Sequence, residues 1–573
     1  MLLVDSAREP PSRDVELVQA PDGEDKGYHI GPSDAVSDDS EPSAAGRTGL
    51  QDSELPLVDG GSTFHIIRPD QLEWTRFNHY AKHVQRIYWE ELRDVSLRAL
   101  TTLSGYCPAG QPLLPQLREL TWDEPCADYS PSVYLFLAPN LKRLELTLSH
   151  LDPPTIIALF QHVEVACKRM DHLTMGTDPV CDEMWELTGV VGYAFARLLR
   201  GLPELKHVKI EGFLSTSCVE ALAELPKLAM LELRVQPVAM CMIASAAFWS
   251  SRHGEWFNAL EELKLYVDQM DSSTITFLGA IQSANLQKLR IESHYQSYTH
   301  IVKAHLDAFA HATYRHSLTS LTLNFDRQRH ETTPCPRIGP TPCPALDVEE
   351  ALGPFYACPH IDTLHIRSPS LVASTNALQN IAHVWRNLAT LSLVSFQPPP
   401  WVKPRLTLEG LIPLARDCPD LCTLELPVSA DRVPDEATLA RLLPEPSRCA
   451  LRRLVVFDAT IEDEHAVADF LARLFPEIRW LESGSTPGGA QWLYTCQVGV
   501  LGLRAIAQNC PWMKELALTR LVCHPEEMDV LPLELLDHGL RHLSVRYGFT
   551  EEMHRVIVNR IFPHLEGGPP TLL

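Results

Sequence analysis

Residues 141–146 read Leu-Lys-Arg-Leu-Glu-Leu, and residues 117–122 read Leu-Arg-Glu-Leu-Thr-Trp. In both stretches apolar residues occupy the first, fourth and sixth positions, and the last three positions alternate as a half-buried strand does. Further copies of this six-residue pattern start at Leu228, Leu260, Leu286, Leu318, Ile361, Leu388, Leu421, Leu451, Met513 and Leu540. Weaker copies start at Met170, Leu205 and Ile478.

These fifteen starts lie about 30 residues apart on average, close to the period of leucine-rich repeats. Between the strands, apolar residues at helical spacing predict helices over 155–170, 191–199, 301–314, 377–387, 409–417, 465–474 and 500–508. One strand with one helix buries too little apolar surface to fold alone, so neighbouring repeats have to share a core. We therefore predict an α/β fold, a horseshoe-shaped leucine-rich-repeat solenoid with parallel strands on the concave face and helices outside.

The chain divides into three parts of different composition. The first 60 residues carry 14 acidic and 4 basic side chains and no apolar periodicity, which predicts a disordered acidic tail over residues 1–62. Residues 63–112 are predicted as a helical N-terminal cap. Its apolar stripe at helical spacing consists of Trp74, Phe77, Tyr80, Ala81 and Val84. The solenoid is expected over residues 113–573, since a repeat array has no upper size for its core.

Charge and cysteine usage limit the partners and the compartment. The formal net charge is −24, and such a surface repels phosphate backbones and anionic headgroups, so we expect no nucleic-acid partner and no membrane partner. The 15 cysteines are scattered singly, and the sequence contains no Asn-x-Ser/Thr sequon, no secretory signal and no apolar stretch of about 20 residues. We expect a reduced, soluble protein of the cytoplasm and/or the nucleus.

A search for chemical sites finds only weak candidates. His79 and His83 are four residues apart on the predicted cap helix and could bind a metal, but no third ligand follows at suitable spacing. Cys335 and Cys343, with His330 nearby, lie in the longest gap between repeats, which we interpret as a Pro/Cys-rich loop. No phosphate-binding Gly-rich loop, His-Glu-x-x-His motif or nucleophile triad can be assembled. We therefore predict no catalytic residues, no cofactor and no metal, and a protein that is not an enzyme.

Three repeats carry a more specific signature, in which a helix is followed by Cys-Pro, one residue and then the strand. They are residues 415–426, residues 507–518 and residues 358–366. This arrangement resembles the cysteine-containing class of leucine-rich repeats known from F-box proteins, the substrate-recognition subunits of SCF ubiquitin ligases. A buried small thiol would pack at the helix end and proline would stop the helix, so we interpret these cysteines as core residues.

A second likeness concerns the N-terminal part. Residues 68–84, with residues 113–120 and 135–141, resemble the segment that follows the F-box in a large group of fungal F-box-like proteins. The F-box itself, a helical module of about 45 residues in that family, is not visible here. The resemblance implies a substrate-recognition subunit that would bind a Skp-type adaptor and cullin if the full product contains an F-box. The alternative is a free-standing interaction scaffold or inhibitor without a ligase link.

The concave face is the expected binding surface, because the residue between the last two apolar positions of each strand points to solvent. Lys209, Lys264 and Arg290 occupy this position in three strands and are expected to form a basic strip suited to an acidic peptide. Arginine and tyrosine are enriched among binding hot spots. The predicted partner-binding residues are Arg143, Glu145, Lys209, Lys264, Tyr266, Arg290, His365, Arg367 and Arg546.

Overall fold

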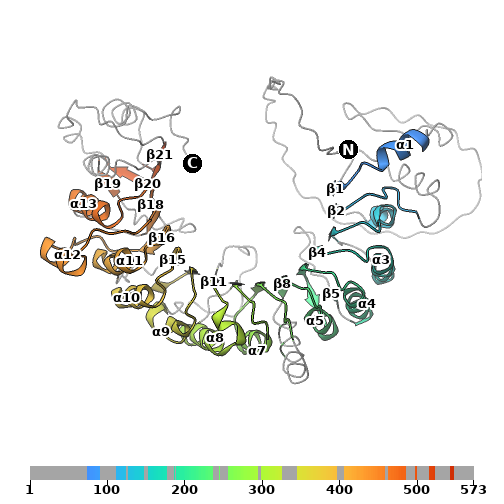
Figure 1. Ribbon diagram of the computed structural model, residues 1–573, viewed down its shortest axis with the longest axis horizontal. Coiled ribbons are helices and arrows are strands. Elements are labelled where there is room, and N and C mark those ends of the chain that lie inside the picture. Colours follow the sequence, from blue (N-terminus) through green and yellow to red (C-terminus); the bar gives the residue numbers. More distant parts are fainter. Residues whose placement is uncertain are drawn as a thin grey trace, which may run out of the picture.

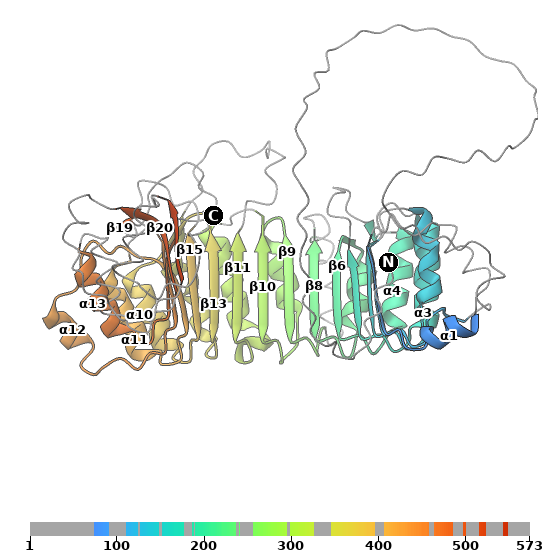
Figure 2. The same cartoon turned by 90° about the horizontal axis from the view of Figure 1, so that it is seen from above.

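The computed structural model forms a curved solenoid in which strands line the inner wall of an arc and helices cover its outside (Figure 1). Seen from above, the strands stand side by side as one continuous wall (Figure 2). The structure describes residues 74–90, 111–123, 127–147, 152–176, 186–187, 189–235, 240, 244, 256–294, 298–325, 345–395, 406–457, 463–484, 497–499, 515–522 and 542–547. The predicted acidic tail over residues 1–62 lies outside these residues.

The inner wall is a 17-stranded sheet whose strands all pair in parallel. From the N-terminal end its strands are β1 (Arg86–Glu90), β2 (Glu119–Asp123), β3 (Arg143–Thr147), β4 (His172–Gly176), β6 (His207–Glu211), β8 (Met230–Val235), β9 (Glu262–Val267), β10 (Lys288–Ser293), β11 (Ser320–Phe325), β13 (Thr363–Ser368), β15 (Thr390–Ser395), β16 (Thr423–Pro427), β17 (Arg453–Phe457), β18 (Trp480–Gly484), β20 (Glu515–Val522) and β21 (His542–Tyr547). The short β19 (Gln497–Gly499) pairs with β20. The predicted horseshoe with parallel concave strands is confirmed.

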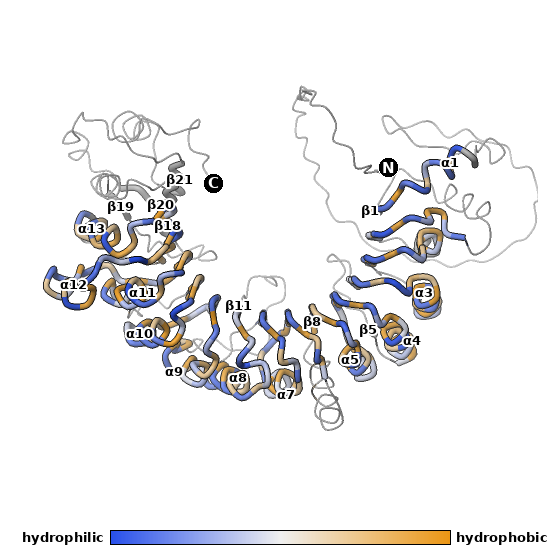
Figure 3. Tube along the Cα trace, in the orientation of Figure 1, coloured by the Kyte–Doolittle hydropathy of each residue, from blue (hydrophilic) through white to orange (hydrophobic). Residues whose placement is uncertain are grey.

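The register places equivalent leucines of successive repeats side by side. Leu144 pairs with Leu173, Leu231 with Leu263, and Leu424 with a leucine of β17. These leucines are fully buried and belong to one continuous hydrophobic core that extends along the arc. Hydrophobic and hydrophilic residues alternate along the strands, as Figure 3 shows. Each repeat thus buries its apolar face against its neighbours, as the leucine spacing predicts.

Helices occupy the outer side of the arc. The α-helices are α1 (Trp74–Ala81), α3 (Pro153–Ala166), α4 (Gly189–Arg200), α5 (Thr216–Ala223), α7 (Ser272–Ala280), α8 (Thr299–His311), α9 (Val348–Leu352), α10 (Thr375–Val384), α11 (Leu411–Asp417), α12 (Glu436–Leu442) and α13 (Glu464–Leu474). The 3-10 helices are η2 (Ala127–Phe136), η3 (Thr313–His316), η5 (Pro354–Ala357) and η6 (Leu408–Gly410). Two-stranded parallel ladders join β5 (Glu186–Leu187) to β7 (Phe213–Leu214) and β12 (Leu346–Asp347) to β14 (Leu371–Val372).

Local sequence explains where several helices begin. Asp271, Ser374, Asp435 and Asp463 each stand immediately before a helix and accept hydrogen bonds from backbone N–H groups of its first turn. Asp152 does the same for α3, which starts with two prolines. These side chains satisfy donors that a helix leaves open at its N-terminus. No helix among the described residues is both long and apolar enough to span a bilayer.

Backbone hydrogen bonds at the start of each strand repeat from one unit to the next. The N–H groups of Lys142 and Arg143 both donate to the carbonyl of Arg118 in the preceding repeat, over 2.8 and 2.9 Å. The same double contact joins Arg479 and Trp480 to a single carbonyl near the other end of the arc. The starting edge of the sheet therefore has its backbone groups satisfied, and only side chains can contact a ligand there.

Two differences from the sequence prediction concern the ends of the array and its short helices. Residues 86–90 form β1 inside the segment 63–112 that the sequence predicts as a helical cap, so the sheet begins before residue 113. Ile87 and Trp89 point into the core, and Val84-x-x-Ile87-x-Trp89 is a copy of the repeat with β-branched and aromatic residues in place of leucine.

The short helices α5, α7, α9 and α12 were not predicted, because segments of five to nine residues show little hydrophobic periodicity. The helix predicted over 500–508 lies outside the described residues.

Candidate functional site

The concave face presents a row of outward side chains, one from each of the 14 wall strands from β1 to β18, between the two buried positions of that strand. We call it the central row. In the order of the strands it contains Tyr88, Thr121, Glu145, Thr174, Lys209, Glu232, Lys264, Arg290, Thr322, His365, Ser392, Glu425, Val455 and Glu482. The sheet register thus brings together residues that are 23 to 43 positions apart in sequence.

In the middle of the arc, the cations of the central row are bound by glutamates. The ammonium nitrogen of Lys209 lies 3.2 Å from carboxylate oxygens of both Glu211 and Glu232. The ammonium nitrogen of Lys264 lies 3.1 Å from Glu262 and 3.8 Å from Glu232. Glu232 therefore bridges two lysines of neighbouring strands, and its side chain is only 17% exposed.

The network continues on both sides of these residues. Arg290 contacts Glu292 of its own strand, Lys288 lies 3.8 Å from Glu262, and Arg234 lies 3.8 Å from Glu211. Over β6 to β10 the concave face thus combines five cations with four carboxylates. The charge of the predicted basic strip of Lys209, Lys264 and Arg290 is therefore largely offset by Glu232 of the central row and by glutamates of the flanking rows. Its role in binding stays a prediction.

The network shifts the pKa of its members. Burial lowers the pKa of Lys209, but the carboxylates of Glu211 and Glu232 outweigh burial and the net pKa is raised. Burial also raises the pKa of the Tyr266 hydroxyl, with the nearby charges of Glu232 and Glu292 adding to the effect. Lys209 therefore remains a cation and Tyr266 a neutral phenol across the physiological pH range.

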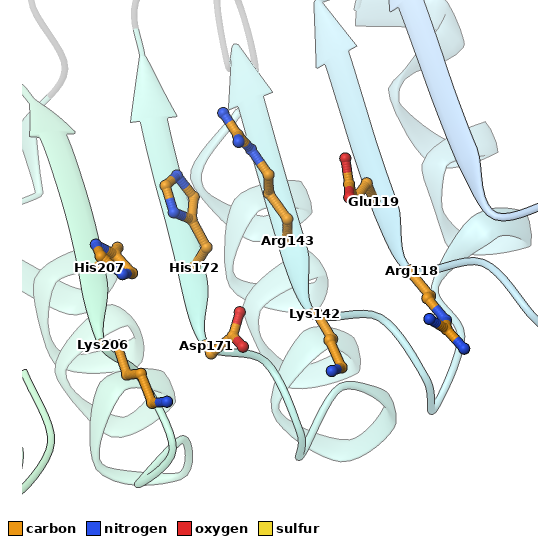
Figure 4. A pocket seen from close by; sticks show the side chains of 8 residues that line it. All are labelled: Arg118, Glu119, Lys142, Arg143, Asp171, His172, Lys206 and His207. Atoms are coloured by element: carbon orange, nitrogen blue, oxygen red, sulfur yellow. The ribbon is translucent and has the colours of Figure 1, made fainter. Parts of the chain in front are cut away.

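A hollow of about 470 Å³ lies at the starting edge of β2, β3, β4 and β6 (Figure 4). We call it the basic hollow. Its lining consists of the last residue before each strand and the first residue of that strand, in four successive repeats. These are Arg118, Glu119, Lys142, Arg143, Asp171, His172, Lys206 and His207.

Charges in the basic hollow are less balanced than in the central network. Glu119 is bound by Arg86 over 3.1 Å, and Arg143 is bound by Glu145 of the central row. Arg118, Lys142 and Lys206 are exposed and make no ion pair among the described residues, and they point toward the same edge (Figure 4). The imidazole rings of His172 and His207 lie 5.5 Å apart, centroid to centroid. Burial, with Arg143 and His207 adding to it, lowers the pKa of His172.

The other predicted binding residues occupy different parts of the face. Burial lowers the pKa of His365, which lies in the central row between Thr322 and Ser392. Arg367 lies two residues further along β13 and is half-buried. Arg546 belongs to β21, whose side chains lie outside the described part of the chain. The predicted residues therefore do not form one cluster.

Toward the C-terminal end the outward side of the strands carries a small apolar cluster among charged residues, which the sequence reasoning did not find. Val394, Val455 and Phe457 form a hydrophobic cluster separate from the main core. The guanidinium of Arg453 lies 5.4 Å from the ring centre of Trp480 and also contacts Glu482. The sequence does indicate this cluster, because valine and phenylalanine occupy outward positions of β15 and β17 where other repeats have polar residues.

The cysteines of the repeat signature are structural where the chain is described. Cys358 and Cys418 are fully buried at helix ends, as predicted. The thiol of Cys418 lies 3.7 Å from the carbonyl oxygen of Trp385 in the preceding repeat, and burial raises its pKa to about 12. Cys510 of the third signature lies outside the described residues, as do Cys335, Cys343 and His330.

The His79 and His83 rings lie 5.7 Å apart on and just after α1. Within the described ranges, no group of three or more His, Cys, Asp or Glu residues is placed to hold a metal ion.

Comparison with known proteins gives only remote likenesses. No protein-family model matches the chain. No curated protein matches it either. Several solved structures resemble it, among them the following three. A chain of the TLR13–ssRNA13 complex has 12% identity and a TM-score of 0.33, with 83% of this chain and 61% of that chain covered. A chain of the yeast Rad7–Elc1 complex has 14% identity and a TM-score of 0.32, with 74% of this chain and 84% of that chain covered. A Bacteroides fragilis protein has 12% identity and a TM-score of 0.22, with 55% of this chain and 65% of that chain covered. This chain thus spans less than two thirds of the length of the chain from the TLR13–ssRNA13 complex.

Proposed function

We propose that this protein binds a protein partner on the concave face of its solenoid and performs no catalysis itself. The supporting observation is the central row, in which parallel strands around the whole arc present one outward side chain each while their leucines remain in the core. A curved wall of this kind offers an extended surface to a folded partner. We further propose that the protein works in the cytoplasm or the nucleus.

The finer proposal is that the chain acts as the substrate-recognition subunit of an SCF-type ubiquitin ligase. It is supported by the buried Cys-Pro helix ends at Cys358 and Cys418, which are the residues that carry the likeness to F-box leucine-rich-repeat proteins. In that role the solenoid selects a target, and a Skp-type adaptor and cullin bring the ubiquitination machinery. The second candidate is a free-standing scaffold or inhibitor, which would hold its partner on the same concave face without a ligase link.

Affinity capture with matched variants tests the binding face. One variant changes Lys288, Arg290 and Arg453 on the concave side to alanine. The control changes Lys227, Lys303 and Arg473, which form exposed ion pairs away from the central row. A partner held on the concave face should be captured about tenfold or more weakly by the first variant and equally by the control, since truncating hot-spot residues costs 1 to 2 kcal/mol or more. Equal capture by both variants would place the partner elsewhere.

Co-purification separates the two finer roles. The full chain is expressed with a Skp-type adaptor and cullin, and their co-elution is measured by size-exclusion chromatography. A stable ternary complex supports the ligase role. A partner that stays bound and unmodified while neither ligase subunit co-elutes supports the scaffold role.

A further inference from the structure

The basic hollow differs from the rest of the concave face because three of its cations form no ion pair with a carboxylate of the described residues. Arg118, Lys142 and Lys206 project from the residue before the strand, a position the central network does not reach. Asp171 stands in the same position of the repeat between the two lysines, as Figure 4 shows. The site therefore has two cationic ends separated by one acidic group.

The basic hollow is also short. The next two residues in this position are Ala229 and Glu261, so the cationic edge ends at β6. Neighbouring parallel strands are about 4.8 Å apart, so Arg118 and Lys206 are separated by about 14 Å along the sheet and Lys142 and Lys206 by about 10 Å. An anionic ligand of this size is a few residues of peptide. A longer polyanion would extend onto β6 to β10, where the cations already bind glutamates and have little charge left to attract it.

The chain itself carries a segment of matching charge and length. Residues 34–41 read Asp-Ala-Val-Ser-Asp-Asp-Ser-Glu, with four carboxylates, and the sequence has no lysine or arginine between Lys26 and Arg47. In an extended peptide Asp34 and Asp38 point to the same side and are about 13 Å apart, which is close to the separation of Arg118 and Lys206.

We propose that residues 34–41 dock in the basic hollow of the same molecule, with the carboxylates of Asp34 and Asp38 at its two cationic ends. The 32 residues that join Glu41 to α1 can extend over at most about 110 Å, so chain length does not prevent the contact. The connection also keeps the segment near β1, one to four strands from its site, at an effective concentration of about millimolar. The docked segment covers the starting edge of four strands and competes with any partner that uses this edge.

Carbodiimide cross-linking of the full chain tests the contact, because this reagent joins a carboxylate to a lysine only when the two are in direct contact. The pair Lys227 and Glu204, with atoms 2.6 Å apart, serves as an internal positive control. We expect cross-links from residues 34–41 to Lys142 or Lys206. Mixing chains of two isotopic compositions shows whether both ends of a cross-link come from one molecule. Cross-links that form only between different molecules, or the control cross-link without the expected ones, would overturn the proposal.

A charge-neutral variant gives a second readout that does not require cross-linking. In Asp34→Asn/Asp38→Asn/Asp39→Asn/Glu41→Gln, acetylation of Lys142 and Lys206 should become faster by about threefold or more, the size expected for the loss of exposed charge pairs. Lys264, held by Glu232 and Glu262, is the matched control and should react at an unchanged rate. Unchanged rates at all three lysines would contradict the docking. Neither experiment needs a partner, so its failure would leave the proposed partner binding untouched.

Discussion

The substitution Leu231→Ala tests the shared core most directly. Leu231 is fully buried in β8, and its register neighbours are Val208 of β6 and Leu263 of β9. Removing a buried leucine side chain costs the transfer energy of its methyl groups and the cavity left behind, about 3 to 5 kcal/mol for a rigid site. Because the neighbouring repeats hold the backbone of β8 from both sides, we expect a cost of about 3 kcal/mol or more.

Hydrogen exchange measured by mass spectrometry locates this loss. In a solenoid each repeat contacts only its neighbours, so the damage should be concentrated in β6, β8 and β9. A loss of about 3 kcal/mol corresponds to exchange roughly 100- to 200-fold faster in these strands. Strands β15 and β16, several repeats away, should exchange at nearly the rate of the unmodified protein.

Lys227→Ala is the matched control, since Lys227 belongs to the same repeat but is exposed in an ion pair with Glu204. Its effect should stay within about 0.5 kcal/mol. The reasoning fails if Leu231→Ala accelerates exchange by less than about fivefold, or if β6 and β16 are accelerated equally.

Trp385→Phe should cost about 1 to 3 kcal/mol in urea unfolding, because the buried indole N–H donates to the carbonyl of Cys358 over 2.7 Å and the variant leaves that carbonyl unpaired. Cys418 should resist iodoacetamide in the native protein, since burial raises its pKa to about 12, while the half-exposed Cys422 reacts first; equal labelling would contradict the burial. Burial lowers the pKa of His305, whose Nε2 has no hydrogen-bond partner, so the fold is destabilised as pH falls below about 6.5, where the unfolded chain takes up the proton first. His305→Gln should therefore reduce the fall of Tm on acidification, and an unchanged fall would refute this.

The candidate site was only partly predictable. The repeat pattern identified the central row correctly, because alternation along a strand decides which residues leave the core. It was incomplete for charge, since Lys209 and Lys264 were considered without the glutamates two residues before or after the central position. Aligning those flanking rows would have shown Glu211 and Glu262 beside them. The basic hollow was not predicted, because its cations precede the strands and belong to four separate repeats.

By itself, the spacing of leucines determined that this chain is a parallel solenoid, where its strands lie and which residues form the core. Such local periodicity suffices because each strand has only two faces and only one of them is apolar. Only the tertiary structure decided which charged side chains meet. Glu232 bridges Lys209 and Lys264 across strands that are joined by loops and helices of unequal length, and side-chain contacts of this kind depend on register and on the curvature of the sheet rather than on spacing in the sequence.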